Sequence, residues 1–349
     1  MKEIRIMERR TMLALSAGAL AEGLLPVRTS AGAEPNKVTV QLDWVVRGDH
    51  AMFFVARHKG YFERNGINLV AIRRGTGSAN ALRLVANGNA QFGFGDLPTL
   101  IISRTHGVAD VAIVAVNQRS PLAMISVAAR HKLVTPQDLK GLTVGADPAA
   151  GSAFLFLKAF LHANGMSLAD IKLRTVSPPY ENYLVLGRVD AIPGYIDAEV
   201  PVLEAKTGGP GSLSILQGAD YGLHSYGSGV FASETLIGDN PDLVQRFVRA
   251  YLLAFRDVVA SPQEAVDIVI AANPEYKSQR AVLLAQLQAD IKGTFFSADT
   301  KSQGLGTITA TRWSETIHML QSEGQLPKSA APKGGFDNRF VAASYPMGR

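Results

Sequence analysis

Val38-Thr39-Val40-Gln41-Leu42, together with the segment that follows it, sets the folding pattern of the chain. These five residues alternate in polarity and are rich in β-branched side chains, which predicts a strand. Apolar residues then recur at helical spacing from His50 to Arg64, and Asn65-Gly66 provides a turn signal at the end. Residues 67–73 predict a second strand. A strand-helix-strand order of this kind is typical of a mainly parallel sheet covered by helices on both faces.

The same order continues on the C-terminal side of this stretch. Further strands are expected at 92–95 and 111–116, and the pattern starts again after Pro121 with strands at 142–145, 171–176 and 191–195. From residue 241 onward the periodicity is almost entirely helical. We therefore expect an α/β protein with two lobes joined by crossing strands near 122–127 and 226–231. The predicted boundaries are 37–122 plus 230–326 for the first lobe and 123–229 for the second.

Composition excludes several classes of function. The chain has 349 residues, which is enough for two domains, and its 47% hydrophobic and 19% charged residues are typical of a globular protein. The net charge of +5 is spread along the chain without a basic run, so nucleic-acid binding is not expected. Cysteine is absent, which excludes disulfides, thiolate metal sites and cysteine nucleophiles.

The N-terminal residues predict export. Arg9-Arg10 is followed by an apolar stretch from Leu13 to Leu25 and by Ala31-Gly32-Ala33, an A-x-A-like cleavage site. We expect a twin-arginine-like signal peptide at 1–33 and a mature periplasmic protein beginning near Glu34. The alternative is an amphipathic N-terminal helix of a cytosolic protein. No later segment has about 18 uninterrupted apolar residues, so the mature protein is expected to be soluble.

Candidate ligand-binding residues follow the ends of the predicted strands, where ligands bind in open α/β sheets. Two loops, Gly75-Thr76-Gly77-Ser78 and the segment from Gly145 to Ser152, occupy matching places in the two lobes, and their backbone N–H groups could face a polar ligand. For single residues the alternatives are a core tryptophan, a buried or capping histidine, or an aspartate N-cap. The predicted ligand-binding residues are Trp44, His50, Ser78, Asp96, Asn117, Ser152, Tyr195 and Asp197.

Catalytic and metal motifs are missing. The sequence contains no H-E-x-x-H, G-x-S-x-G or S-x-x-K motif, and its seven histidines have no metal-ligand spacing. A carboxylate pair formed by Asp96 and Asp197 is the one catalytic alternative that the sequence leaves open. We expect a binding protein with no cofactor and no metal, and not an enzyme.

From Val38 to about Leu326 the chain resembles the NMT1/THI5-like, SsuA/TauA-type substrate-binding proteins. The resemblance implies the type II periplasmic binding fold, with a ligand cleft between two lobes, and a monomeric receptor that delivers its solute to an ABC permease and its ATPase. Trp44 and His50, and less directly Asp197, match the branch that binds thiamine-precursor pyrimidines. The resemblance is carried by Leu42-Asp43-Trp44, by His50 to Phe62, by Gly66-Ile67-Asn68-Leu69, by Leu84 to Gly93, by Asp138-Leu139-Lys140-Gly141 and by Gly187 to Ala191.

The proteins that this chain resembles include two groups with other functions. The fungal pyrimidine synthases use a lysine for pyridoxal phosphate on the segment that matches Gly93 to Asp96, together with a cysteine-rich stretch. Here Asp96 occupies the place of the lysine and cysteine is absent, which is unfavourable for synthase activity. Relatives that bind sulfonates, nitrate, taurine or aromatic carboxylates would hold an anion at the two glycine-serine loops. The candidate carboxylates Asp43, Asp96, Asp147 and Asp197 would repel such an anion.

Overall fold

The structure is a computed structural model of the chain that describes residues 35–147, 152–176, 180–330 and 334–345. The predicted signal peptide at 1–33 lies outside the described residues, as does the side chain of Ser152. Within the described part, no helix combines the length and the apolar character that crossing a bilayer requires. Residues 35–349 form one compact unit, so the predicted boundary between two lobes stays a prediction.

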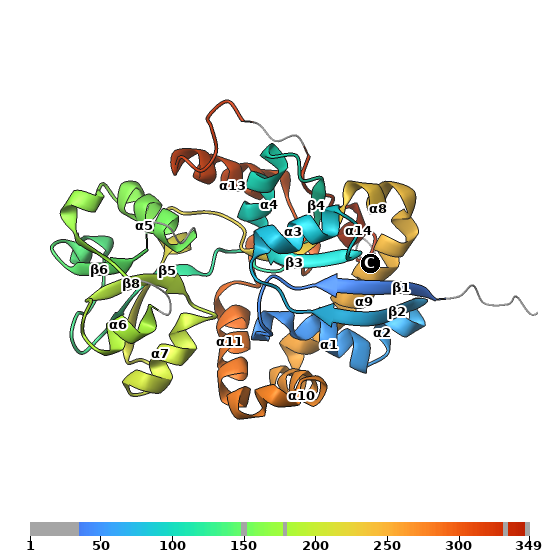
Figure 1. Cartoon of the computed structure of the whole chain (residues 1–349), viewed down its shortest axis with the longest axis horizontal. Coiled ribbons are helices and arrows are strands. Elements are labelled where there is room, and N and C mark those ends of the chain that lie inside the picture. Colours follow the sequence, from blue (N-terminus) through green and yellow to red (C-terminus); the bar gives the residue numbers. More distant parts are fainter. Residues whose placement is uncertain (1–34, 148–151, 177–179, 331–333, 346–349) are drawn as a thin grey trace, which may run out of the picture. The chain divides into compact units, whose positions relative to one another are not determined.

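The first sheet has five strands in the order β2-β1-β3-β10-β4. Figure 1 shows β2, β1 and β3 of this sheet side by side. Strands β1, β2 and β3 pair in parallel, as the sequence predicts, whereas β10 runs antiparallel between β3 and β4. Val38 and Val40 are fully buried as expected, but the polar residues between and after them, Thr39 and Gln41, are buried as well, because helices cover both faces of the sheet. The strands are β1 (Asn36–Gln41), β2 (Ile67–Arg73), β3 (Phe92–Asp96), β4 (Asp110–Ala115) and β10 (Ser228–Ser233).

Helices cover both faces of the first sheet. One face packs on α1 (Ala51–His58), α2 (Tyr61–Arg64), α9 (Pro241–Ala260) and α10 (Pro262–Ala272). The other face packs on α3 (Ser78–Ala86), α4 (Leu97–Thr105) and α13 (Ala310–Ser322). The predicted helix over 50–64 is divided in two, because Gly60 adopts a left-handed conformation with φ of 67°. The remaining helices after β10 are α8 (Glu234–Asp239), α11 (Arg280–Gly293), α12 (Ala298–Gln303) and α14 (Arg339–Ala342).

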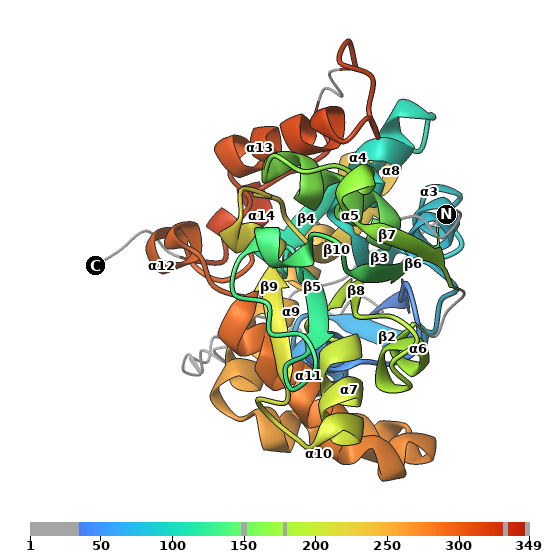
Figure 2. The same cartoon turned by 90° about the vertical axis from the view of Figure 1, so that its left-hand side faces the viewer.

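The second sheet has the order β7-β6-β8-β5-β9. Its strands are β5 (Leu122–Val127), β6 (Thr143–Ala146), β7 (Lys172–Thr175), β8 (Ala191–Tyr195) and β9 (Leu213–Gln217). Figure 2 shows α5 (Ser152–Ala163) on one side of this sheet, and α6 (Glu181–Val185) and α7 (Glu199–Thr207) on the other. Two separate apolar clusters, one with α5 and one with α6 and α7, bury the two faces.

The two chain segments that connect the sheets are bonded to each other. The backbone N–H of Gly227 donates to the carbonyl of Asn117, and the N–H of Asn117 donates to the carbonyl of Ser228. The segment predicted as the first crossing, 122–127, is strand β5 of the second sheet, and the chain passes between the sheets just before it. The second crossing likewise comes before β10, which belongs to the first sheet.

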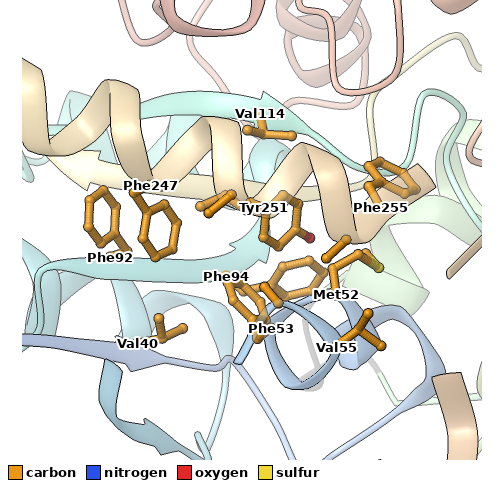
Figure 3. Packing of buried hydrophobic residues seen from close by; sticks show 14 of the residues in the cluster. Val40, Met52, Phe53, Val55, Phe92, Phe94, Val114, Phe247, Tyr251 and Phe255 are labelled. Carbon is orange, nitrogen blue, oxygen red and sulfur yellow. The ribbon is translucent and has the colours of Figure 1, made fainter. Parts of the chain in front are cut away.

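Aromatic rings fill the core beside the first sheet (Figure 3). The ring of Phe92 on β3 stacks on that of Phe247 on α9, with centroids 3.6 Å apart and an interplanar angle of 7°. Phe53 on α1 contacts Phe94 edge-on and lies against Tyr251. Rings of this size contribute much of the apolar area that stabilises such a core. This packing fixes the positions of the carboxyl ends of β1 and β3.

Candidate functional site

A cavity of about 650 Å³ lies between residues of the two sheets. We call it the main cavity. On the side of the first sheet, its wall comes from the loop after β1, the start of α3 and the junction of β3 with α4. On the side of the second sheet, it comes from the end of β8 and the start of α7. Its lining residues are Asp43, Trp44, Val45, Val46, Arg47, Gly77, Ser78, Ala79, Asp96, Thr99, Pro121, Ala153, Tyr180, Tyr195, Asp197, Ala198, Glu199, Ser228, Gln279, Leu283 and Gln286.

Trp44 stands at the edge of this cavity with 49% of its surface exposed, which is unusual for a large apolar side chain. Its backbone is held by the glycine loop that follows β2. The N–H of Gly75 donates to the Trp44 carbonyl, and the N–H of Gly77 donates to the Asp43 carbonyl. A Cβ atom on Gly75 would lie 2.1 Å from the carbonyl oxygen of Leu42, so this close approach requires glycine.

His50 lies behind the cavity wall and not in it. Its side chain is fully buried, and it is absent from the residues that line the main cavity. Nδ1 accepts a hydrogen bond from the backbone N–H of Arg47 at 3.1 Å, and Nε2 is 3.1 Å from Oδ1 of Asp43. Because Nδ1 is an acceptor, the neutral ring carries its proton on Nε2 and donates it to Asp43. The predicted ligand-binding histidine is therefore placed as a residue that positions Asp43.

Arg47 neutralises the carboxylates around it. Its Nη2 is 3.0 Å from Oδ2 of Asp49 and 3.4 Å from Oδ2 of Asp43. Burial raises the pKa of Asp43, but the charge of Arg47 and the hydrogen bond from His50 outweigh burial, so the pKa lies below its ordinary value. Asp43 is thus an ionised acceptor in the cavity wall. Arg47 was not among the residues predicted from the sequence. Its only signal in the sequence is its position four residues after Asp43.

Ser78 and Asp96 meet where β3 passes into α4. The backbone N–H of Asp96 donates to Oγ of Ser78 at 3.0 Å, and Ser78 Oγ also lies 3.4 Å from Oδ2 of Asp43. Oδ2 of Asp96 accepts from both the N–H and the hydroxyl of Thr99, so Asp96 is the N-cap of α4 that the sequence offered as an alternative. It also lines the main cavity. Burial raises its pKa to about 6.

Asp197 enters the main cavity from the end of β8. It is 5% exposed, and within the described part of the chain its Oδ1 has no hydrogen-bond partner. Burial, together with the nearby charge of Asp49, raises its pKa to about 7. The unpaired Oδ1 is itself shielded from solvent, so only the small exposed part of the side chain can meet a ligand donor.

Asp49, Asp197 and Asp290 form a buried acidic cluster in which one carboxylate oxygen from each lies within 4.8 Å of the others. Three carboxylates at this spacing could hold a cation, but the guanidinium of Arg47 already contacts Asp49. Burial and the neighbouring carboxylates also raise the pKa of Asp290 well above its ordinary value. The arrangement is accordingly that of carboxyl groups that share protons beside one fixed positive charge.

The other predicted residues are distributed differently. Tyr195 lines the main cavity, and its backbone N–H donates to the carboxylate of Glu199. Asn117 does not line it: the residue is fully buried, and its amide donates to Asp290 and Thr294 of the α11 region, which anchors the segment that connects the sheets. The side chain of Ser152 lies outside the described residues. Trp44, Ser78, Asp96, Tyr195 and Asp197 are therefore brought together, whereas His50 and Asn117 support the wall from behind.

Residues 47–265 match the family model described as NMT1/THI5 like. The chain belongs to this family. It is 27% identical over 315 residues to the riboflavin-binding protein RibY of Chloroflexus aurantiacus, an alignment that covers 87% of this chain and 86% of the relative. It is also 27% identical over 311 residues to the formylaminopyrimidine-binding protein of Halalkalibacterium halodurans, covering 86% and 89%.

The fold of this family member is that of the periplasmic binding proteins. The aliphatic sulphonate binding protein SsuA of Escherichia coli superposes with a TM-score of 0.65 at 16% identity, covering 85% of this chain and 90% of SsuA. More distant relatives include the 4-amino-5-hydroxymethyl-2-methylpyrimidine phosphate synthase THI5 of Saccharomyces cerevisiae, which is 23% identical over 69% of this chain. The relatives of this chain thus include proteins named as binding proteins and proteins named as enzymes. The residues that line the cavity are therefore needed to decide between the two roles.

Proposed function

We propose that this chain is the solute-binding component of an ABC importer, and that it holds a small ring-containing solute in the main cavity and releases it unaltered. The observation that carries the proposal is that Trp44 after β1 and Asp197 after β8 line the same cavity from the two sheets. Relatives named for binding riboflavin and a formylaminopyrimidine support a ring-shaped solute.

The charges of the cavity favour a solute that donates hydrogen bonds. Four carboxyl groups line it, from Asp43, Asp96, Asp197 and Glu199, and among the described residues Arg47 is the single lysine or arginine in the lining. In this role Trp44 would stack on the ring, and Asp197 would accept from a ring N–H or an exocyclic amine. Arg47 is engaged by Asp43 and Asp49, so an anionic solute would meet mainly like charge.

The lining offers little for catalysis. The described residues that line the main cavity include no lysine, histidine or cysteine that could act as a nucleophile or carry pyridoxal phosphate. This supports a binding role over the synthase activity of the distant relatives. Absorbance of pyridoxal phosphate in the purified protein would contradict it.

We also infer that the chain is exported and acts with a membrane permease and an ATPase. The twin-arginine pair Arg9-Arg10 and the apolar stretch after it support export to the periplasm. Replacing Arg9 and Arg10 with lysine in the full chain should leave the protein in the cytoplasm if export uses the twin-arginine route. Fractionation of cells that express each form measures this.

Calorimetry tests the solute class. The protein is titrated with 4-amino-5-hydroxymethyl-2-methylpyrimidine, riboflavin, taurine and nitrate, using the unaltered chain and the variants Asp197→Asn and Asp267→Asn. Asp267 is an exposed aspartate paired with Arg280 and serves as the matched control. We expect one of the ring compounds to bind, with weaker binding to Asp197→Asn only. Binding of taurine or nitrate alone would replace the ring-shaped solute with an anion.

A further inference from the structure

A second cavity, of about 210 Å³, adjoins the main cavity. We call it the side chamber. Asp96 and Thr99 line both, so the two spaces lie against the same residues at the N-terminus of α4. Like the main cavity, the side chamber is bounded from both sheets, by α4 and α13 on one side and by β5 and α5 on the other.

The walls of the side chamber are mainly apolar. Ile102 on α4 and Leu155 on α5 are partly exposed and face it from opposite sides, and Leu223 and Met319 extend the apolar wall. Its remaining lining residues are Pro98, Ser120, Leu122, Phe156, Ser225, Leu320, Glu323 and Gln325. The main cavity carries four carboxyl groups and an arginine, whereas the side chamber has carboxyl groups only from Asp96 at the junction and from Glu323, which accepts a hydrogen bond from Gln325.

Both spaces are lined largely by apolar surface, but the side chamber has fewer charged groups, and this difference in charge favours a solute with two unlike ends. A polar ring satisfies the carboxylates of the main cavity, and an apolar substituent would gain from leaving water for the walls of the side chamber. The chamber volume suits a group of about the size of a phenyl ring, because engineered apolar cavities of about 150 Å³ bind benzene. A single pyrimidine ring would leave this space unused.

We propose that the side chamber is a second subsite for the transported solute, which takes an apolar arm attached to the ring held beside Trp44 and Asp197. The proposal rests on the proposed function and deepens it: the solute class becomes an elongated molecule with a hydrogen-bonding ring at one end and an apolar group at the other. Because the arm contacts both α4 and α5, it would also hold the two sides of the site together.

A matched set of ligands tests the subsite. The probes are 4-amino-5-hydroxymethyl-2-methylpyrimidine and its methyl, benzyl and phenethyl ethers, which share the ring and differ in the arm. Titration of the unaltered chain should show at least about tenfold tighter binding of the benzyl or phenethyl ether than of the methyl ether. Equal affinity for all of the ethers would overturn the proposal.

Filling the chamber provides the second measurement. Ile102→Trp and Leu155→Trp place a large ring in the chamber from opposite walls, and Val70→Trp adds the same ring at an exposed position that lines neither cavity. Both filling variants should lose the advantage of the aromatic ethers and still bind the parent pyrimidine, whereas Val70→Trp should behave like the unaltered chain. Thermal unfolding identifies any variant that is not folded, and either filling variant suffices.

The outcomes separate the two proposals. Binding of the parent pyrimidine with no gain from the arm, or a gain that persists in the filled variants, would overturn the subsite and leave the proposed function intact. Failure of all four probes and of riboflavin to bind the folded, unaltered chain would count against the proposed ring-shaped solute itself.

Discussion

Nε2 of His50 lies 3.1 Å from Oδ1 of Asp43, and this contact joins a fully buried imidazole to a carboxylate in the wall of the main cavity. The other oxygen of Asp43 lies 3.4 Å from both Arg47 and Ser78. Asp43 is thus held from three sides, and its free rotation is lost before any solute arrives. Preorganisation of this kind reduces the ordering cost of binding.

Replacing His50 tests this positioning role. His50→Ala should lower the free energy of unfolding by about 1–3 kcal/mol, because it leaves a buried carboxylate oxygen without its donor. Urea unfolding measures the change, and the exposed His106→Ala is the matched control. Partial recovery of stability in His50→Gln is expected, since the amide can still donate. Unchanged stability in His50→Ala would show that the contact contributes nothing.

Replacing Trp44 should affect binding and not stability. The side chain is half exposed, so Trp44→Ala removes little buried area from the fold, but it removes a ring that would stack on the solute. Stacking and burial together predict at least about tenfold weaker binding of the solute found by calorimetry. Phe296→Ala, which removes another exposed ring that lines neither cavity, should leave affinity unchanged. Equal effects of the two variants would contradict the role of Trp44.

Removing the positive charge of Arg47 is expected to destabilise the fold around the cavity wall. Arg47→Met leaves Asp43 and Asp49 buried without their cation, which predicts a loss of about 3–5 kcal/mol in the free energy of unfolding. The exposed pair Arg280–Asp267 provides the control, because Arg280→Met should cost less than about 1 kcal/mol. Chemical unfolding of both variants at pH 7 makes the comparison. A small loss in Arg47→Met would mean that protons already neutralise the cluster.

The stability of the protein without solute should fall as pH rises from about 4 to about 7 and level off at higher pH. Burial raises the pKa of Asp197 to about 7, so between these values the folded state binds a proton that the unfolded state has released. That proton stabilises the fold at low pH, and the stabilisation is lost as pH rises through the folded pKa. Asp197→Asn should therefore flatten the pH dependence and stabilise the fold by about 1–3 kcal/mol at pH 8. An unchanged slope would show that Asp197 titrates normally.

Solute binding should have the opposite pH dependence. A solute that donates N–H groups favours the ionised carboxylates of Asp96 and Asp197, so binding should release protons and become tighter as pH rises through about 6 to 7. Calorimetry in two buffers with different ionisation enthalpies measures the number of protons released. Proton uptake on binding would indicate an anionic solute.

Much of the fold could be predicted from the chain because apolar periodicity reports burial directly. Val38 and Val40 alternate with more polar neighbours and lie in the core as expected. The predicted mainly parallel arrangement is only partly right, because four of the eight strand pairings in the described residues are antiparallel: β10 pairs in this way with β3 and β4, and β5 with β8 and β9. The antiparallel pairing of β10 was not foreseen, because its partners lie more than 100 residues away in sequence. Strand β9, which directly follows a glycine-rich loop, was not predicted from the sequence.

The site was predicted less completely than the fold. Position after a strand correctly brought Trp44, Asp96, Tyr195 and Asp197 to one cavity, because the carboxyl ends of parallel strands meet at one edge. Side-chain direction was not available from this pattern. His50 is the N-cap of α1, six residues after Trp44, yet its side chain is buried in the core. Asp290 joins Asp49 and Asp197 only through the packing of α11.

The place of β10 between β3 and β4 also determines when the two sheets can be completed. The second sheet uses strands between residues 122 and 217, all of which are available before β10 is made. The first sheet must leave a gap between β3 and β4 until residues 228–233 arrive. During synthesis from the N-terminus, a chain ending near residue 220 therefore has every strand of one sheet and an open seam with unpaired edges in the other. Such a nascent chain would be prone to strand pairing with its neighbours.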